Sequence, residues 1–138
     1  MALSVQDRIE IGELIALHGH LMDAGELDRM DELFTAEITY DVSDFGFGQL
    51  HGIAALQEAA VALGDGNPVG HHVTNVIIAE VDGAVRVRSK GIGIYADGTS
   101  GSVEYDDAVA RTATGWRISY RRVIAHRLPL GGRATRSA

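Results

Sequence analysis

Two adjacent histidines, His71 and His72, open an apolar stretch rich in β-branched residues. That composition predicts a strand carrying a titratable imidazole into the interior. Successive side chains of a strand point to opposite faces, so only one of the two can face inward. The inward imidazole is either an ordinary hydrogen-bonded core group or a base for proton transfer.

A carboxylate and a third imidazole lie near the end of a helix predicted over residues 5–22. His18 falls on its apolar stripe, and Asp23 follows its last turn. Taken alone, His18 is interpreted as a core histidine and Asp23 as a capping or solvated group. Ser4 predicts the N-cap of this helix, and Gly25 predicts the residue just beyond its C-cap.

The composition excludes several classes of function. The 138 residues fit one domain, and a net charge of -7 lacks the basic footprint of a nucleic-acid-binding protein. The absence of cysteine excludes disulfides, thiolate nucleophiles and Cys-ligated metals. No run approaches the roughly 20 apolar residues that cross a bilayer, and the first residues do not resemble a signal peptide. We therefore expect a cytoplasmic protein without a membrane partner.

The periodicity changes from helical to strand-like along the chain. Four late strands, joined by hairpin turns such as Asp82-Gly83, predict an antiparallel meander. Gly91 and Gly93 share one face, which predicts a bend or a close approach there. We expect an α+β domain over residues 1–126 and a flexible tail over 127–138. The predicted elements are helices at 5–22, 27–34 and 53–63 and strands at 37–42, 71–81, 84–96, 102–112 and 116–125.

The order and spacing of several motifs resemble the SnoaL-like branch of the nuclear transport factor 2-like superfamily. The similarity covers about residues 5–126 and extends to the group of scytalone dehydratase, bile-acid 7α-dehydratase and hexachlorocyclohexane dehydrochlorinase. It implies a cone of curved antiparallel sheet wrapped by three N-terminal helices. The motifs are Leu21-Met22-Asp23, His71-His72-Val73-Thr74-Asn75-Val76, Asp82-Gly83, Tyr105-Asp106-Asp107 and Gly115-Trp116-Arg117-Ile118.

The resemblance implies a catalytic pair. In that group an Asp at the end of the first helix pairs with a His at the start of the first long strand, which here are Asp23 and His71. The dehydrochlorinase has an Arg six residues past a strand Trp, which matches Arg122, on the face expected for Trp116. His18 departs from the pattern, because several members have a tyrosine there.

These residues predict a cofactor-independent lyase. An imidazole fixed by a carboxylate can take a proton from carbon, so we expect dehydratase-type elimination on a small hydrophobic cyclic substrate. No metal or cofactor is expected, and the resemblance implies a homodimer or homotrimer. The residues expected to assist or bind substrate are His18, Tyr40, Asn75, Tyr95, Tyr120 and Arg122.

Several alternatives stay open. The same base would serve a polyketide cyclase or a ketosteroid-type isomerase, and domains of this fold can also be non-catalytic binding or assembly modules. A metal site built from His18, His71 and His72 is disfavoured, because adjacent strand residues diverge. Asp106 and Asp107 are interpreted as sheet-edge or salt-bridged acids, with Arg121 as a partner. The remaining histidines, His51 and His126, are expected in surface, turn or interface roles.

Overall fold

The structure is a computed structural model that describes residues 2–135. Its helices and strands are α1 (Val5–Asp23), β1 (Phe34–Asp41), β2 (Gln49–His51), α2 (Ile53–Leu63), β3 (Gly70–Val81), β4 (Ala84–Ile94), β5 (Ser100–Thr112) and β6 (Gly115–His126). The two α-helices and the five longer strands follow the predicted order, and the three-residue strand β2 was not predicted. Four short 3₁₀ segments join them: η1 (Leu27–Glu32), η2 (Ser43–Phe45), η3 (Gly64–Gly66) and η4 (Pro129–Thr135). The second predicted helix is therefore the 3₁₀ segment η1.

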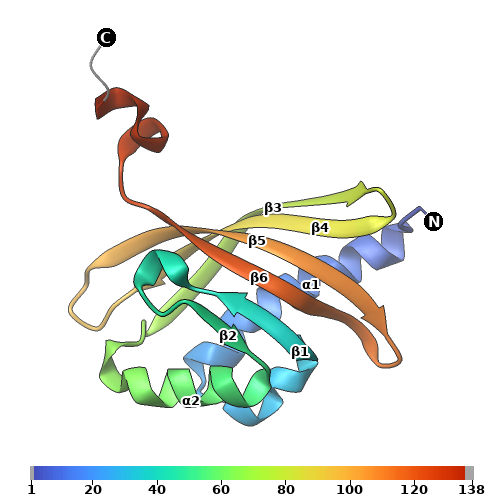
Figure 1. Cartoon of the computed structure of the whole chain (residues 1–138), viewed down its shortest axis with the longest axis horizontal. Helices are drawn as coiled ribbons and strands as arrows, with labels where there is room; N and C mark the ends of the chain where they lie inside the picture. The colour runs from blue at the N-terminus through green and yellow to red at the C-terminus, as the bar shows by residue number, and fades with distance from the viewer. Residues whose placement is uncertain (1, 136–138) are drawn as a thin grey trace.

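A curved sheet of six strands, ordered β2-β1-β6-β5-β4-β3, forms the body of the molecule. α1 passes behind the long strands, and α2 lies beside β1 and β2 (Figure 1). β3 to β6 form the predicted antiparallel meander, and the α+β class is confirmed. The prediction of a wholly antiparallel sheet is wrong at one place, because β1 pairs with β6 in parallel. These two strands are far apart in sequence, so no hairpin fixes their relative direction.

The C-terminal segment leaves the sheet after β6. η4 projects away from the body of the molecule (Figure 1). Residues 136–138 of the predicted flexible tail lie outside the described residues, and the mobility of the tail stays a prediction. Within residues 2–135, no helix combines the length and the apolar character needed to cross a membrane.

Both ends of α1 are fixed by local hydrogen bonds that the sequence predicts. The Ser4 hydroxyl accepts the Asp7 backbone N–H, and the Asp7 carboxylate accepts the Ser4 N–H, each at 3.0 Å. At the other end Gly25 has φ +69° and donates its N–H to Met22 O at 3.1 Å. The Glu26 N–H returns to Leu21 O at 2.9 Å, which completes a Schellman motif.

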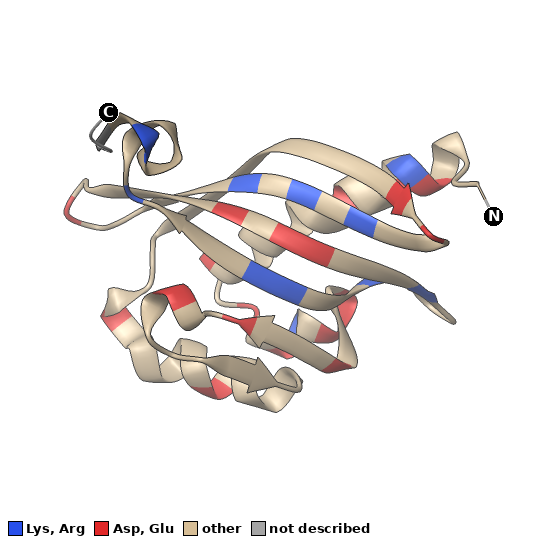
Figure 2. Cartoon of the chain, turned by 45° about the horizontal axis from the view of Figure 1, so that its top comes forward, with Lys and Arg blue, Asp and Glu red and all other residues tan. Residues whose placement is uncertain are grey.

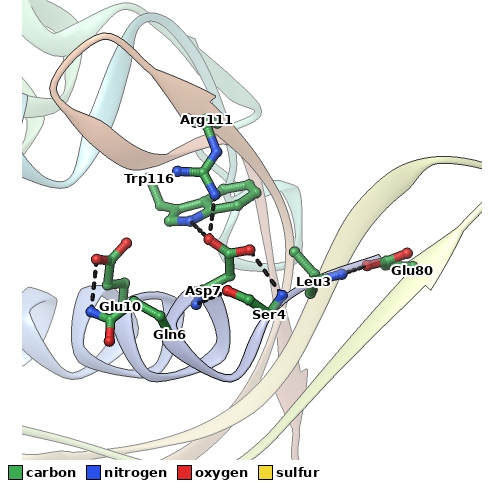
Figure 3. A network of polar contacts seen from close by, with 8 residues as sticks. All are labelled: Leu3, Ser4, Gln6, Asp7, Glu10, Glu80, Arg111 and Trp116. Atoms are coloured by element: carbon green, nitrogen blue, oxygen red, sulfur yellow. Dashed lines mark hydrogen bonds and ion pairs between the residues drawn. The ribbon is translucent and has the colours of Figure 1, made fainter. Parts of the chain in front are cut away.

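Asp7 also fastens α1 to the hairpin between β5 and β6 (Figure 3). Its Oδ1 accepts hydrogen bonds from the Arg111 guanidinium and from Trp116 Nε1, the latter at 3.3 Å. The hydrogen bond from the Ser4 backbone lowers the pKa of Asp7, and burial opposes this effect. Further hydrogen bonds from the Ser4 hydroxyl and Arg111 also favour the carboxylate, so the pKa of Asp7 is about 2. The capping residue of the helix is thus also its anchor to the sheet.

The core lies between α1 and the inner face of the sheet. The buried apolar residues of α1 are Ile11, Leu14, Ile15 and Leu21, and they pack in one cluster with Phe34, Ile38, Val87, Val109 and Ile118 from the strands. Burial of side chains of this size stabilises a fold by about 1.5–3 kcal/mol each, so this cluster sets the position of the helix on the sheet.

A bulge in β3 and another in β6 reverse the face of the sheet to which the later side chains of each strand point. In β3 the register shifts between Thr74 and Ile77, where Asn75 has φ +56°. In β6 the shift leaves Ser119 as the extra residue opposite β5. A bulge adds one residue, so every side chain beyond it points to the opposite face. The predicted alternation is therefore wrong beyond both points, and Arg121, not Arg122, faces inward.

Candidate active site

His71 and Asp23 meet where the end of α1 touches the start of β3. His71 Nδ1 lies 2.6 Å from Asp23 Oδ1, and the backbone N–H of His71 lies 3.0 Å from each carboxylate oxygen. The contact depends on Gly19 of α1, where a Cβ would lie 2.5 Å from the carbonyl oxygen of His71. A glycine there lets the helix backbone approach the strand closely enough for the two side chains to bond.

His71 lines a cavity of about 1270 Å³ bounded mostly by apolar side chains. Because Nδ1 is bonded to Asp23, Nε2 is the ring nitrogen left for a ligand. His72 is exposed and is not among the lining residues, so the question of which histidine faces the interior is resolved in favour of His71. Within residues 2–135 no cluster of three or more acids and histidines is arranged to hold a metal ion.

His18 lies beside His71 on the cavity wall. Only 4% of its surface is exposed, and the centroid of its ring is 5.8 Å from that of His71, with the two planes perpendicular. Burial, with the nearby charges of Arg121 and His71, lowers the pKa of His18 well below its usual range. Its Nδ1 has no hydrogen-bond partner in the described part of the chain. His18 is therefore a neutral imidazole with an unused polar atom next to the pair.

Two phenols add to the polar part of the cavity lining. Tyr40 and Tyr105 both line it, and burial raises the pKa of each, so both keep their hydroxyl proton. Tyr105 was not among the predicted site residues, although its motif was recognised. The available signal was Gly91, where a Cβ would lie 2.5 Å from the Tyr105 ring. The close approach predicted at Gly91 is thus made by this tyrosine.

A buried ion pair lies behind these phenols. Arg121 and Asp107 are both fully buried and form a two-point contact, Nε–Oδ1 at 2.7 Å and Nη2–Oδ2 at 2.8 Å. The Arg121 guanidinium carbon is 4.1 Å from the centroid of the Tyr105 ring. The predicted pairing of Asp107 with Arg121 is confirmed. Neither residue lines the cavity, so they support the tyrosines from behind.

The other predicted assisting residues divide into two groups. Tyr95 lines the cavity, together with Phe45 and Phe47 of the loop between β1 and β2, and all three side chains are exposed. Contrary to prediction, three residues lie outside the cavity lining: Asn75, Tyr120 and Arg122. The bulges explain the displacement, because Asn75 occupies the bulge of β3 and the other two follow the bulge of β6.

Arg122 is exposed on the outer face of the sheet and lies opposite Asp106 of β5. Figure 2 shows acidic positions along β5 between basic positions on β4 and β6. Arg86 on β4 bonds Asp106 on β5 at 2.8 Å, and Arg88 lies 3.7 Å from Glu104. Exposed ion pairs of this kind contribute little to stability. The charged pattern marks a face that points away from the cavity.

Comparison with known proteins agrees with this geometry. Residues 4–122 match the family model described as a SnoaL-like domain. The chain belongs to the SnoaL-like family. No curated protein matches this SnoaL-like chain significantly.

Three of the solved structures with a similar fold come from Novosphingobium aromaticivorans. One is a nuclear transport factor 2-like protein with a cystatin-like fold, 26% identical, with a TM-score of 0.74 over 97% of this chain and 91% of that one. Another is a candidate aromatic ring hydroxylase, 23% identical, TM-score 0.71, covering 92% and 94%. A third is a candidate scytalone dehydratase, 17% identical, TM-score 0.73, covering 89% and 86%. The last two likenesses support the fold.

Proposed function

We propose that this SnoaL-like protein is a cofactor-independent lyase that removes water from a small hydrophobic cyclic substrate. The observation that carries the proposal is the 2.6 Å contact between His71 Nδ1 and Asp23 Oδ1 at the wall of an apolar cavity. A carboxylate bonded to one imidazole nitrogen fixes the tautomer and leaves the other nitrogen to accept a proton.

The first step is removal of a proton from carbon. His71 Nε2 takes the proton from the carbon next to a carbonyl group, and the electrons of the C–H bond form an enolate. Asp23 balances the positive charge that His71 then carries. The apolar lining keeps water from this charge pair, which strengthens the attraction between its members.

The developing oxyanion has donors within the same cavity. The hydroxyl groups of Tyr40 and Tyr105 are protonated and buried, so they can donate hydrogen bonds to the enolate oxygen. Arg121 contacts the face of the Tyr105 ring. Because Asp107 holds Arg121 in place, this contact restrains the ring. Tyr105 therefore joins Tyr40 and His18 among the proposed assisting residues, and Arg122, which is outside the cavity lining, does not.

The second step releases water. The enolate electrons form the carbon–carbon double bond and expel the hydroxyl group from the next carbon. The proton carried by His71 passes to that hydroxyl, so water leaves and His71 returns to its neutral form. In this proposal His18, which is neutral and next to His71, holds the departing oxygen by a hydrogen bond. If the enolate instead takes its proton back at another carbon, the reaction is an isomerisation.

The test uses a cyclic β-hydroxy ketone and follows formation of the conjugated enone by its absorbance and the loss of water by mass spectrometry. His71→Gln and Asp23→Asn should each lower the rate at least about 100-fold, the usual contribution of a general base. His72→Gln is the matched control, since its ring is exposed outside the cavity. Unchanged turnover in His71→Gln would refute the proposal, and a product of unchanged mass would favour the isomerase.

A further inference from the structure

The cavity differs in charge from the rest of the protein. The chain carries 19 acidic and 12 basic residues, yet none of the described residues that line the cavity is Asp or Glu. Among those lining residues Arg127 is the one permanently charged side chain. A ligand in the cavity therefore meets neutral groups over most of its surface and one cation.

Arg127 is held at the opening by the loop that bears the two phenylalanines. It directly follows β6, and its guanidinium carbon lies 5.4 Å from the centroid of the Phe45 ring. Its Nη2 donates a hydrogen bond to the backbone oxygen of Asp44 at 3.2 Å. The Asp44 carboxylate accepts the N–H of Ala125 at 3.0 Å. These contacts place the cation beside an aromatic ring at the rim.

Among the described residues, the guanidinium of Arg127 contacts a backbone oxygen and an aromatic ring. Within residues 2–135, no ion pair joins Arg127 to a carboxylate. Glu104, the nearest acid along the neighbouring strand, pairs instead with Arg88 and with His126, the latter at 3.6 Å. A guanidinium with free N–H groups binds carboxylate and sulfonate oxygens well.

We propose that the cavity binds amphipathic organic anions, with the apolar body inside and the anionic group bound by Arg127 at the rim. The volume of about 1270 Å³ exceeds that of a usual small-molecule pocket, roughly 300–1,000 Å³, and so accommodates a body that extends from His71 to the opening. As a statement about substrate, this rests on the proposed function. As a statement about binding, it does not require catalysis.

The experiment compares two fluorescent probes with the same aromatic body. 8-Anilinonaphthalene-1-sulfonate carries a sulfonate, and N-phenyl-1-naphthylamine is its neutral counterpart. We expect each probe to displace the other, which places both in one cavity, and we expect the sulfonate to bind more tightly at low salt. Arg127→Gln should weaken binding of the sulfonate about fivefold, the upper end for a solvent-exposed ion pair, and leave the neutral probe unchanged.

Arg122→Gln is the matched control, because it removes an arginine from the outer face of β6 and should change neither affinity. Added salt should weaken sulfonate binding in the wild type more than in Arg127→Gln. The proposal is overturned if Arg127→Gln leaves the ratio of the two affinities unchanged, or if the probes do not compete. His71→Gln should keep the ratio while losing turnover, so failure of the catalytic proposal is seen separately.

Discussion

Gly19 of α1 touches the backbone carbonyl of His71, so the helix that carries Asp23 has no gap between itself and the strand that carries its partner. A Cβ at residue 19 would lie 2.5 Å from that oxygen, closer than any ordinary contact. The geometry of the pair is thus set by backbone packing, with the side-chain hydrogen bond of 2.6 Å as its result.

Gly19→Ala should destabilise the fold and lower turnover, although alanine is the better helix former. The control is Gly12→Ala in the same helix, where a Cβ would meet nothing within 4 Å. There we expect the ordinary gain of about 0.5–1 kcal/mol in the free energy of unfolding. Urea unfolding measures both, and equal stabilisation by the two variants would show that the close approach is absent.

His18 should make stability depend on pH in the mildly acidic range. Burial lowers the pKa of His18 in the folded state, whereas the unfolded imidazole takes up a proton near pH 6.5. The unfolded state therefore binds more protons than the folded state below that pH. Keeping His18 neutral thus costs the folded state nothing above about pH 6.5, and the free energy of unfolding decreases as the pH falls below it. His18→Gln should flatten this part of the curve of unfolding free energy against pH, while the exposed His20→Gln should not.

Asp7 should govern a second acid transition at lower pH. Its pKa is lowered to about 2 in the folded state, below the 3.8 of an ordinary aspartate. The stability it supplies is present above about pH 4 and is lost as the pH falls toward 2. Asp7→Asn should lower the melting temperature at neutral pH and remove most of this acid dependence. Glu10→Gln, on the exposed side of the same helix, should retain the wild-type profile in thermal unfolding between pH 2 and 5.

The pair of Arg121 and Asp107 should show strong coupling. Both are fully buried, so Arg121→Met leaves an unpaired carboxylate in the interior and should cost about 3–5 kcal/mol of unfolding free energy. Adding Asp107→Leu should recover much of that loss, because the double variant buries no charge. Arg122→Met, one residue away on the exposed face, should stay within about 0.5 kcal/mol. If the double variant loses as much unfolding free energy as the two single variants, Arg121→Met and Asp107→Leu, lose together, the two residues are not coupled and the prediction is wrong.

Local sequence signals predicted the elements well where short-range chemistry decides the structure. Ser4 and Asp7 begin α1 and Gly25 ends it, as their side-chain and backbone preferences require. The hairpin at Asp82-Gly83 and the strands around it follow from turn chemistry and period-two patterning. The resemblance paired Asp23 with His71, and the structure brings these two into contact; their catalytic role stays a prediction.

Local patterns thus predicted the order of the helices and long strands, the caps of α1 and the α+β class, and they missed the short strand β2. The tertiary structure decided the parallel pairing of β1 with β6, which no local turn constrains. The face that each strand presents could likewise be known only from the folded chain, because a one-residue bulge at Asn75 or Ser119 barely alters the hydrophobic pattern and yet inverts every side chain beyond it. For this reason Arg121, and not Arg122, lies against the ring of Tyr105 at the cavity of the His71 pair.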